Sequence, residues 1–108
     1  MNKFDYQTCE WDEYKVVIVS SEDRRASCRI YIYHDEPEVA VICDLYVDKE
    51  SRNQGKACAI LNRCKDIARE MGCKKMQLRS DTDDWVRQWY RRIGFKEISS
   101  QVWMEAEL

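Results

Sequence analysis

One segment constrains the fold more than any other, because its apolar pattern changes period between residues 39 and 80. Residues 39–47, VAVICDLYV, form an almost continuous apolar run, which is typical of a strand covered on both faces. The period then becomes helical and predicts a helix over residues 54–71 with Gly72 as its C-terminal cap. Residues 74–80, KKMQLRS, predict a second strand. A strand, a helix and a strand in this order require a right-handed parallel crossover, with residues 39–47 at the centre of the sheet.

The remaining segments predict further strands and one more helix. Residues 14–20 and 28–34 are rich in β-branched and aromatic residues and flank a polar turn, which indicates a hairpin. Asp81–Asp84 supplies acidic capping chemistry for a helix over about residues 84–93, with Trp85, Val86, Trp89, Tyr90 and Ile93 on one face and Gly94 after its end. Residues 95–100 and 102–108 can add one or two closing antiparallel strands. The predicted fold class is α/β, as a mixed α+β sheet of about six strands with two main helices.

Size and charge limit the functions that the chain can have. A chain of 108 residues with 44% apolar residues fits one domain over residues 1–108. A net charge of −2 argues against nucleic acid as a partner, and the basic residues on the helix exteriors (Arg63, Lys65, Arg69, Arg91, Arg92) are interpreted as a solvated surface. The sequence has no run of roughly 18 to 20 apolar residues and no signal-peptide pattern, so we expect a cytoplasmic protein with no membrane partner.

The six cysteines do not indicate a disulfide framework or a metal site. They are scattered and none forms a CxxC pair: Cys9, Cys28, Cys43, Cys58, Cys64 and Cys73. We expect reduced thiols, most of them small core residues, and no metal. A catalytic cysteine is disfavoured because His34, the only histidine, lies in a turn-like segment without an obvious cysteine partner.

The junction between the central strand and the long helix is the best candidate for a binding site. Gly55 at this point lets backbone N–H groups turn toward an anion, and the positive end of the helix favours the same anion. Arg52 and Lys56 flank the glycine and could add charge-assisted contacts to phosphate oxygens. An ordinary helix entry with two basic residues is the alternative interpretation.

Two segments of the sequence resemble the GNAT superfamily of N-acetyltransferases. LYVDKESRNQGKACAIL (45–61) is similar to the family's motif A, whose signature Q/R-x-x-G-x-G/A is filled by Arg52, Gly55 and Ala57. WYRRIGF (89–95) resembles the end of motif B, with Tyr90 at the tyrosine position. The resemblance covers residues 38–98 and agrees with the order of elements above.

The resemblance implies acetyl-coenzyme A (acetyl-CoA) as the acyl donor, with direct transfer to an amine and no metal. It implies that backbone groups of Leu45, Tyr46 and Val47 bind the pantetheine arm. It also implies that the amides of residues 52–58 cradle the pyrophosphate, namely Arg52, Asn53, Gln54, Gly55, Lys56, Ala57 and Cys58. An amide of the strand could stabilise the developing oxyanion.

The catalytic roles that the resemblance implies fall on few residues. Tyr90 would protonate the departing thiolate; the alternative is a core aromatic residue. A general base is harder to assign, since Val41 falls near the position where some relatives have a glutamate. Asp44 is the nearest carboxylate, on the strand face opposite Cys43 and Leu45, and a water chain competes with it for this role. Asp83 replaces an asparagine that contacts the cofactor in relatives, and with Asp81 and Asp84 it could form an acidic lip that attracts a cationic amine.

The first 38 residues lack the two amphipathic helices with which GNAT proteins commonly begin, so the acceptor side should be open. An open site fits a lysine side chain or N-terminal amine of a protein better than a small metabolite. The alternative is a homodimer, anchored through Trp11 or Trp103, in which the partner completes a site for a small amine or polyamine. A second hypothesis, of another class, is a catalytically weak CoA-binding interaction module.

Overall fold

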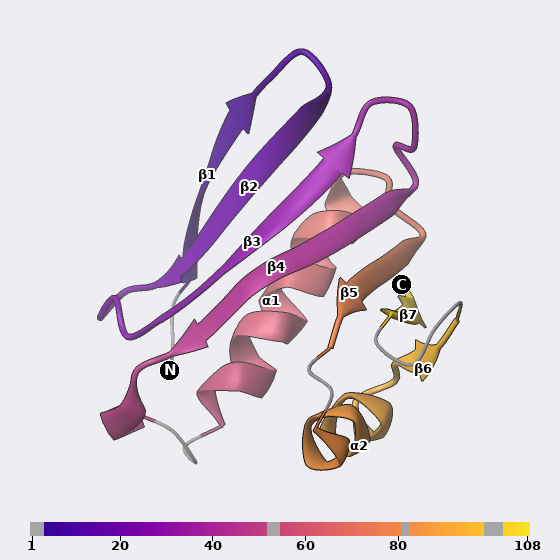
Figure 1. Ribbon diagram of the computed structural model, residues 1–108. Coiled ribbons are helices and arrows are strands. Elements are labelled where there is room, and N and C mark those ends of the chain that lie inside the picture. The colour runs from indigo at the N-terminus through magenta and orange to yellow at the C-terminus, as the bar shows by residue number, and fades with distance from the viewer. Residues whose placement is uncertain (1–3, 52–54, 81–82, 99–102) are drawn as a thin grey trace.

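The computed structural model describes residues 4–51, 55–80, 83–98 and 103–108. In these residues one sheet contains seven strands in the order β1-β2-β3-β4-β5-β7-β6 (Figure 1). The elements are β1 (Phe4–Glu10), β2 (Tyr14–Ser21), β3 (Ala26–Tyr33), β4 (Val39–Val47), the 3₁₀ turn η1 (Lys49–Ser51), α1 (Lys56–Glu70), β5 (Lys75–Arg79), α2 (Asp84–Arg92), β6 (Lys96–Glu97) and β7 (Trp103–Glu107).

The predicted crossover is confirmed, because β4 and β5 pair in parallel and α1 connects them. β4 is the middle strand of the sheet, and the predicted hairpin is formed by β2 and β3. Gly72 follows α1 at φ 88°, and its N–H donates to Arg69 O while that of Cys73 donates to Ala68 O. This double hydrogen bond is the Schellman arrangement expected of a C-terminal glycine.

The strand that sequence reasoning did not predict is β1, which brings the number of strands from about six to seven. Its segment FDYQTCE pairs with β2 along its whole length, yet every residue after Phe4 is exposed. An exposed edge strand needs no alternation of apolar residues, so its sequence carries little of the usual strand signal.

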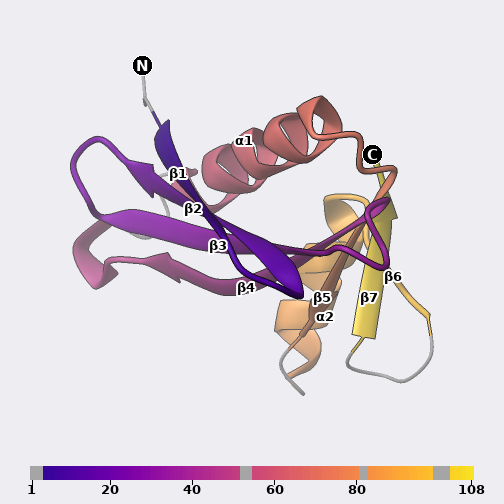
Figure 2. The ribbon, with the colours of Figure 1, turned by 90° about the horizontal axis from the view of Figure 1, so that it is seen from above.

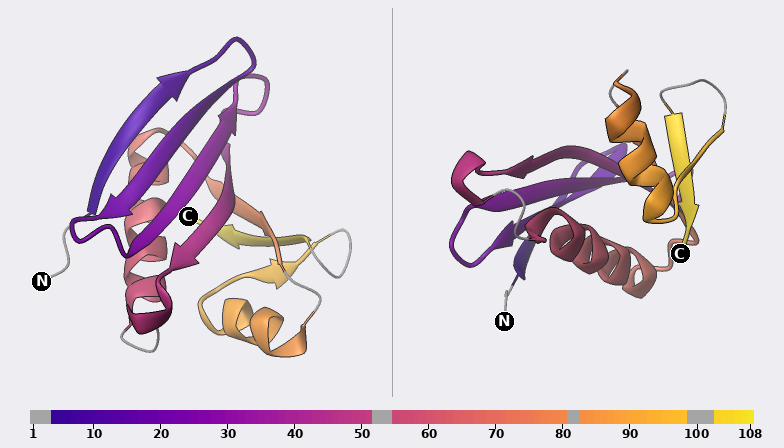
Figure 3. Two further views of the ribbon diagram at one scale, coloured as in Figure 1. Left: turned by 60° about the vertical axis from the view of Figure 1, so that its left-hand side comes forward. Right: turned by 90° about the horizontal axis from the view of Figure 1, so that it is seen from below.

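The core lies between α1 and one face of the sheet. Ile60, Leu61 and Ile67 of α1 are fully buried against that face. The views from above and from below show α1 along one side of β1–β4, and no helix of the described residues covers the other side (Figures 2 and 3). The prediction that β4 is covered on both faces is therefore wrong: Ala40 and Ile42 are buried, whereas Val39 and Val41 are half-buried. In the part of the chain that the structure describes, no helix has the length and apolarity needed to cross a membrane.

All six cysteines are free thiols. Cys28, Cys64 and Cys73 are buried, Cys43 and Cys58 are half-buried, and Cys9 is exposed. The expectation of core positions thus holds for half of them.

A β-bulge in β4 separates the two halves of the sheet. Arg29 of β3 pairs with Cys43 and Ser27 pairs with Tyr46, so two residues of β4, Asp44 and Leu45, face one residue of β3. Asp44 has φ 54°, a left-handed conformation that aspartate tolerates better than most residues. The parallel ladder with β5 ends at Ile42 and Leu78, and the two strands diverge beyond it (Figure 1).

The bulge also reverses which residues face α1. Ala40 and Ile42 face the core before it, whereas Leu45 and Val47 pack against the core after it. Simple alternation placed Cys43 and Leu45 on one face, and the extra residue makes that placement wrong.

Candidate functional site

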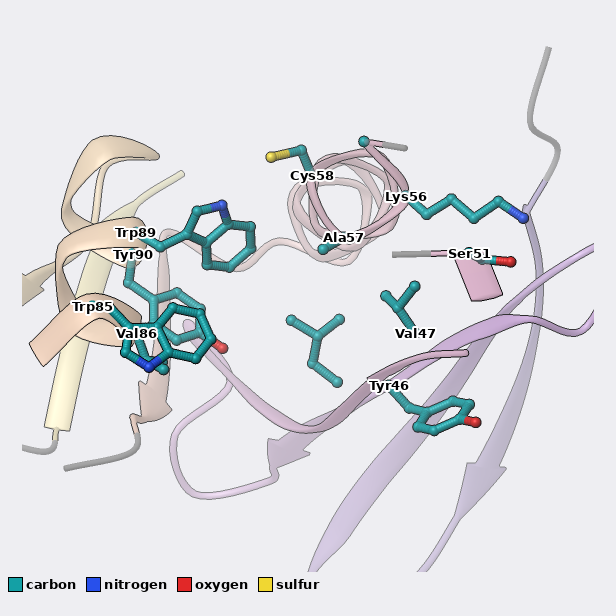
Figure 4. A pocket seen from close by; sticks show the side chains of 12 residues that line it. Tyr46, Val47, Ser51, Lys56, Ala57, Cys58, Trp85, Val86, Trp89 and Tyr90 are labelled. Carbon is teal, nitrogen blue, oxygen red and sulfur yellow. The ribbon is translucent and has the colours of Figure 1, made fainter. Parts of the chain in front are cut away.

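A pocket of about 480 Å³ lies beyond the end of the β4–β5 ladder, between the end of β4, the start of α1 and α2 (Figure 4). Ser51 of η1 also lines it and is buried. This volume is within the range of small-molecule sites. The pocket therefore opens where β4 leaves β5, next to the bulge.

The β4 wall consists of the three residues predicted to bind the pantetheine arm. Leu45 and Val47, two residues apart on the same face of β4, are half-buried and pack against the core. Tyr46 lies between them and is 52% exposed at the pocket edge. The structure thus brings Leu45, Tyr46 and Val47 to one wall of the pocket.

The start of α1 forms the second wall. Gly55 caps the helix in the left-handed conformation, with φ 76°, and its carbonyl accepts the first helical hydrogen bond from Ala59 N at 3.0 Å. Ala57 and Cys58 in the first turn line the pocket with it. The first N–H groups of a helix have no partner within the helix and carry its partial positive charge, so this wall suits an anion. The predicted cradle residues Arg52, Asn53 and Gln54 lie outside the described residues.

Lys56 has a partner other than the one expected. Its Nζ donates a hydrogen bond to Asp23 Oδ2 at 2.6 Å, and its side chain is only 10% exposed. Figure 4 shows the side chain extending away from Trp89 and Tyr90. The hydrogen bond from Lys56 holds the pKa of Asp23 well below its ordinary value of 3.8. Lys56 thus lines the pocket and pairs with the β2–β3 turn, and its contact with phosphate oxygens stays a prediction.

The α2 wall is aromatic and contains the predicted acid. Tyr90 is half-buried, its ring centroid 5.0 Å from that of Trp89 and 5.7 Å from that of Phe95. Burial raises the pKa of Tyr90 above its ordinary value of 10.0, and the nearby Cys28 thiol adds to this effect. Tyr90 therefore keeps its proton at neutral pH and can act as a donor in the pocket.

Sequence reasoning missed the other pocket residues of α2, Trp85, Val86 and Trp89. It placed them on one face of the helix without assigning that face to a site, and Trp85 is 71% exposed. Helical periodicity identifies the face that points inward and does not distinguish a packed core from a pocket wall. An excess of large aromatic residues on a two-turn helix was the available signal.

The two predicted carboxylates lie at the margins. Asp44 is 70% exposed in its side chain, with Oδ2 3.8 Å from Arg29 Nη1 on the neighbouring strand, and it is not part of the pocket lining. Asp83 is exposed at the N-cap of α2 and makes no side-chain capping hydrogen bond. Asp81, the first residue of the predicted acidic lip, lies outside the described residues. The described lining residues include no carboxylate and no imidazole.

The comparisons with known proteins agree on one family. The model of the acetyltransferase (GNAT) family matches residues 2–95. A search of curated proteins gives no match.

Solved structures share the fold at low sequence identity. A Klebsiella pneumoniae protein has a TM-score of 0.78 and 13% identity, over 100% of this chain and 98% of that one. The ribosomal-protein-S18-alanine N-acetyltransferase of Escherichia coli has a TM-score of 0.75 and 14% identity, over 99% and 94%. An acetyltransferase of Bacillus cereus has a TM-score of 0.69 and 18% identity, over 97% and 74%.

Proposed function

Since the chain belongs to the acetyltransferase (GNAT) family, we propose that it transfers an acetyl group from acetyl-CoA directly to a primary amine of a protein, either a lysine side chain or an N-terminal amine. The observation that carries the proposal is the pocket where β4 leaves β5, with one wall formed by the start of α1. Family membership implies acetyl-CoA as the donor; the amine and the residue roles are our assignment.

The residues at the pocket fit acetyl-CoA. Leu45 and Tyr46 lie beyond the β4–β5 ladder, where their backbone groups can bind an amide-containing arm. The left-handed Gly55 and the first turn of α1 offer N–H groups and a positive helix end to a pyrophosphate. Trp85 and Trp89 add apolar area on the facing wall. Acetyl-CoA supplies an acetyl group that is activated as a thioester.

Tyr90 is the residue that we assign to proton transfer. Its raised pKa keeps the phenol protonated, so it can donate a proton to a thiolate that leaves within the pocket. An amide of β4 would donate to the thioester carbonyl oxygen as negative charge develops there. Because no carboxylate lines the described pocket, we assign removal of the amine's proton to solvent water.

The acceptor side supports a protein amine. The described residues before β4 form three strands and their turns, with no helix that would enclose a small molecule, and no helix of the described part of the chain covers the face of β1–β4 opposite α1 (Figures 2 and 3). The Escherichia coli neighbour is named for an alanine of ribosomal protein S18, a protein substrate of the kind proposed here. A homodimer acting on a small amine is the competing option, with Trp11 (60% exposed) and Trp103 (36%) available for an interface.

The donor site can be tested by calorimetric titration with acetyl-CoA. Ala57 lies in the first turn of α1 and lines the pocket, so Ala57→Glu places a carboxylate where the pyrophosphate is proposed to bind. Because the position has ordinary helical geometry, binding should be lost while the fold is kept. Asn62→Glu makes the same charge change on an exposed position of α1 and should bind like wild type. Absence of binding by the wild-type protein at millimolar acetyl-CoA would refute the proposal.

The acceptor class needs a separate experiment. Labelled acetyl-CoA should transfer its label to protein or peptide amines, and intact-mass analysis identifies the modified chain. Efficient transfer to polyamines but not to peptides, together with a dimer in solution, would favour the small-amine alternative.

A further inference from the structure

The β2–β3 turn is joined to the start of α1 by an ion pair. Lys56, the first residue of α1, reaches Asp23 of this turn at 2.6 Å, although the two residues are far apart in the sequence. Within the turn, Asp23 Oδ1 accepts hydrogen bonds from the Ser21 hydroxyl at 2.6 Å and from Arg25 N at 3.0 Å. Ser21 is itself buried and its Oγ accepts from Ala26 N at 3.0 Å. Asp23 is therefore held in place by the turn before it meets Lys56.

The same turn also holds the segment that leads from β4 to α1. Asp48 N donates to Arg25 O at 2.6 Å, and Arg25 Nη1 lies 3.8 Å from Asp48 Oδ2 and 3.6 Å from Glu50 Oε2. The β2–β3 turn thus contacts the chain both before and after Gly55, which caps α1 at the pocket.

Electrostatics gives Asp23 a specific role. A lysine at the first position of a helix lies at the positive end of the helix dipole, where a cation is unfavourable. The stem of Lys56 packs closely, since only 10% of its side chain is exposed, while its bond to Asp23 lies at the surface. The carboxylate of Asp23 offsets the unfavourable position of the cation at the helix end. Without it the lysine side chain would have to leave its site, and the first turn of α1 would lose its fixed position.

We propose that Asp23 is a positioning residue for the donor site: it holds Lys56 and thereby keeps the first turn of α1 in the geometry that binds the pyrophosphate of acetyl-CoA. Lys56 acts in this arrangement through its ion pair and not through contact with the ligand. The proposal rests on the proposed function, because it takes acetyl-CoA as the ligand of this pocket.

A cycle of three variants distinguishes positioning from direct contact. In Asp23→Asn the lysine is left without its partner, and the Kd for acetyl-CoA should rise about fivefold, the upper end of the effect expected for a partly exposed ion pair. Lys56→Met keeps the apolar stem and removes the ammonium, so it breaks the same ion pair from the other side and its Kd should rise by a similar factor. The double variant should bind like Lys56→Met. If Lys56 contacted the phosphates, Asp23→Asn would tighten binding and Lys56→Met would weaken it, and that result would overturn the proposal.

The control is Glu38→Gln, which breaks the exposed Lys74–Glu38 ion pair and changes the net charge by the same amount. It should leave the Kd unchanged. A lower melting temperature of Asp23→Asn with an unchanged Kd would show a merely structural role and would also overturn the proposal.

Hydrogen exchange at the amides of residues 59–61, which donate the first hydrogen bonds of α1 beginning with Ala59 N to Gly55 O, tests the same idea without ligand. Exchange should become faster by a similar factor in Asp23→Asn, in Lys56→Met and in the double variant. If wild-type protein does not bind acetyl-CoA, the proposed function fails while this measurement still decides whether Asp23 positions α1. Unchanged exchange in Asp23→Asn would refute the positioning role.

Discussion

Gly55→Ala is the substitution that tests the geometry of the site most directly. Gly55 adopts φ 76°, and a Cβ atom added there would meet nothing within 4 Å. Any effect of alanine therefore comes from the backbone conformation and not from a steric clash. Gly72, at the other end of α1, has φ 88° and equally open surroundings, which makes Gly72→Ala a matched control.

The size of the effect follows from two opposing terms. A left-handed conformation costs an L-residue about 1–2 kcal/mol, whereas alanine stabilises by about 0.4–1 kcal/mol through the unfolded chain. The free energy of unfolding should fall by about 1 kcal/mol in both variants, which lowers the melting temperature by roughly 4–8 °C for a domain near this size. If the local backbone of Gly55→Ala relaxes to negative φ, the binding-competent form becomes about fivefold rarer and the Kd for acetyl-CoA rises by the same factor.

Thermal unfolding of the two variants gives the change in melting temperature, and calorimetric titration gives the change in Kd for acetyl-CoA. We expect equal destabilisation, with weaker acetyl-CoA binding in Gly55→Ala only. Gly55→Asn should recover part of both losses, because asparagine tolerates the left-handed region. An unchanged melting temperature in Gly55→Ala, or an equal loss of affinity in Gly72→Ala, would refute the reasoning.

Three further substitutions test the α2 wall of the pocket and the role of Asp44. Tyr90→Phe should lower kcat by about 10²-fold with little change in KM. The pKa of Tyr90 is raised in the folded protein, so this residue's contribution to stability should be complete below pH 10 and be lost as the pH rises through the folded pKa. Melting temperatures of the wild type measured over this pH range should show the loss, and those of the variant should not. Trp85→Ala should leave the melting temperature nearly unchanged, because the side chain is 71% exposed, but raise the Kd for acetyl-CoA about five- to tenfold; equal affinity would exclude Trp85 from the site. Asp44→Asn should keep the rate within about twofold and leave its pH profile unchanged, since Asp44 faces Arg29 and not the pocket, whereas a tenfold loss would assign it the role of base.

The sequence was sufficient to predict the elements whose apolar pattern is enforced by burial. The helix predicted over residues 54–71 is observed over Lys56–Glu70, and the strand predicted over residues 39–47 has those bounds. Local pattern and tertiary packing agree in these segments. β1 could not be predicted in the same way, because an exposed edge strand buries almost none of its side chains.

Within the site, the positions of the motif residues could be predicted but not their partners. Gly55 and Tyr90 line the pocket as expected. The ion pair of Lys56 with Asp23 joins segments that local patterns cannot connect, and it decides which way the lysine points. Trp85 and Trp89 could not be assigned to the pocket for a similar reason, because helical periodicity does not show whether a helix face packs against a core or lines a cavity.

The bulge at Asp44 makes the length of β4 matter as much as its composition. Deleting this one residue would turn Leu45 and Val47 toward the open face of the sheet and Tyr46 toward α1. The same deletion would straighten β4, so that it could continue its ladder along β5 and close the gap between them. A single lost codon would thus reverse half a strand and remove the binding site together, whereas Asp44→Asn, which keeps a residue that tolerates the left-handed conformation, would leave both intact.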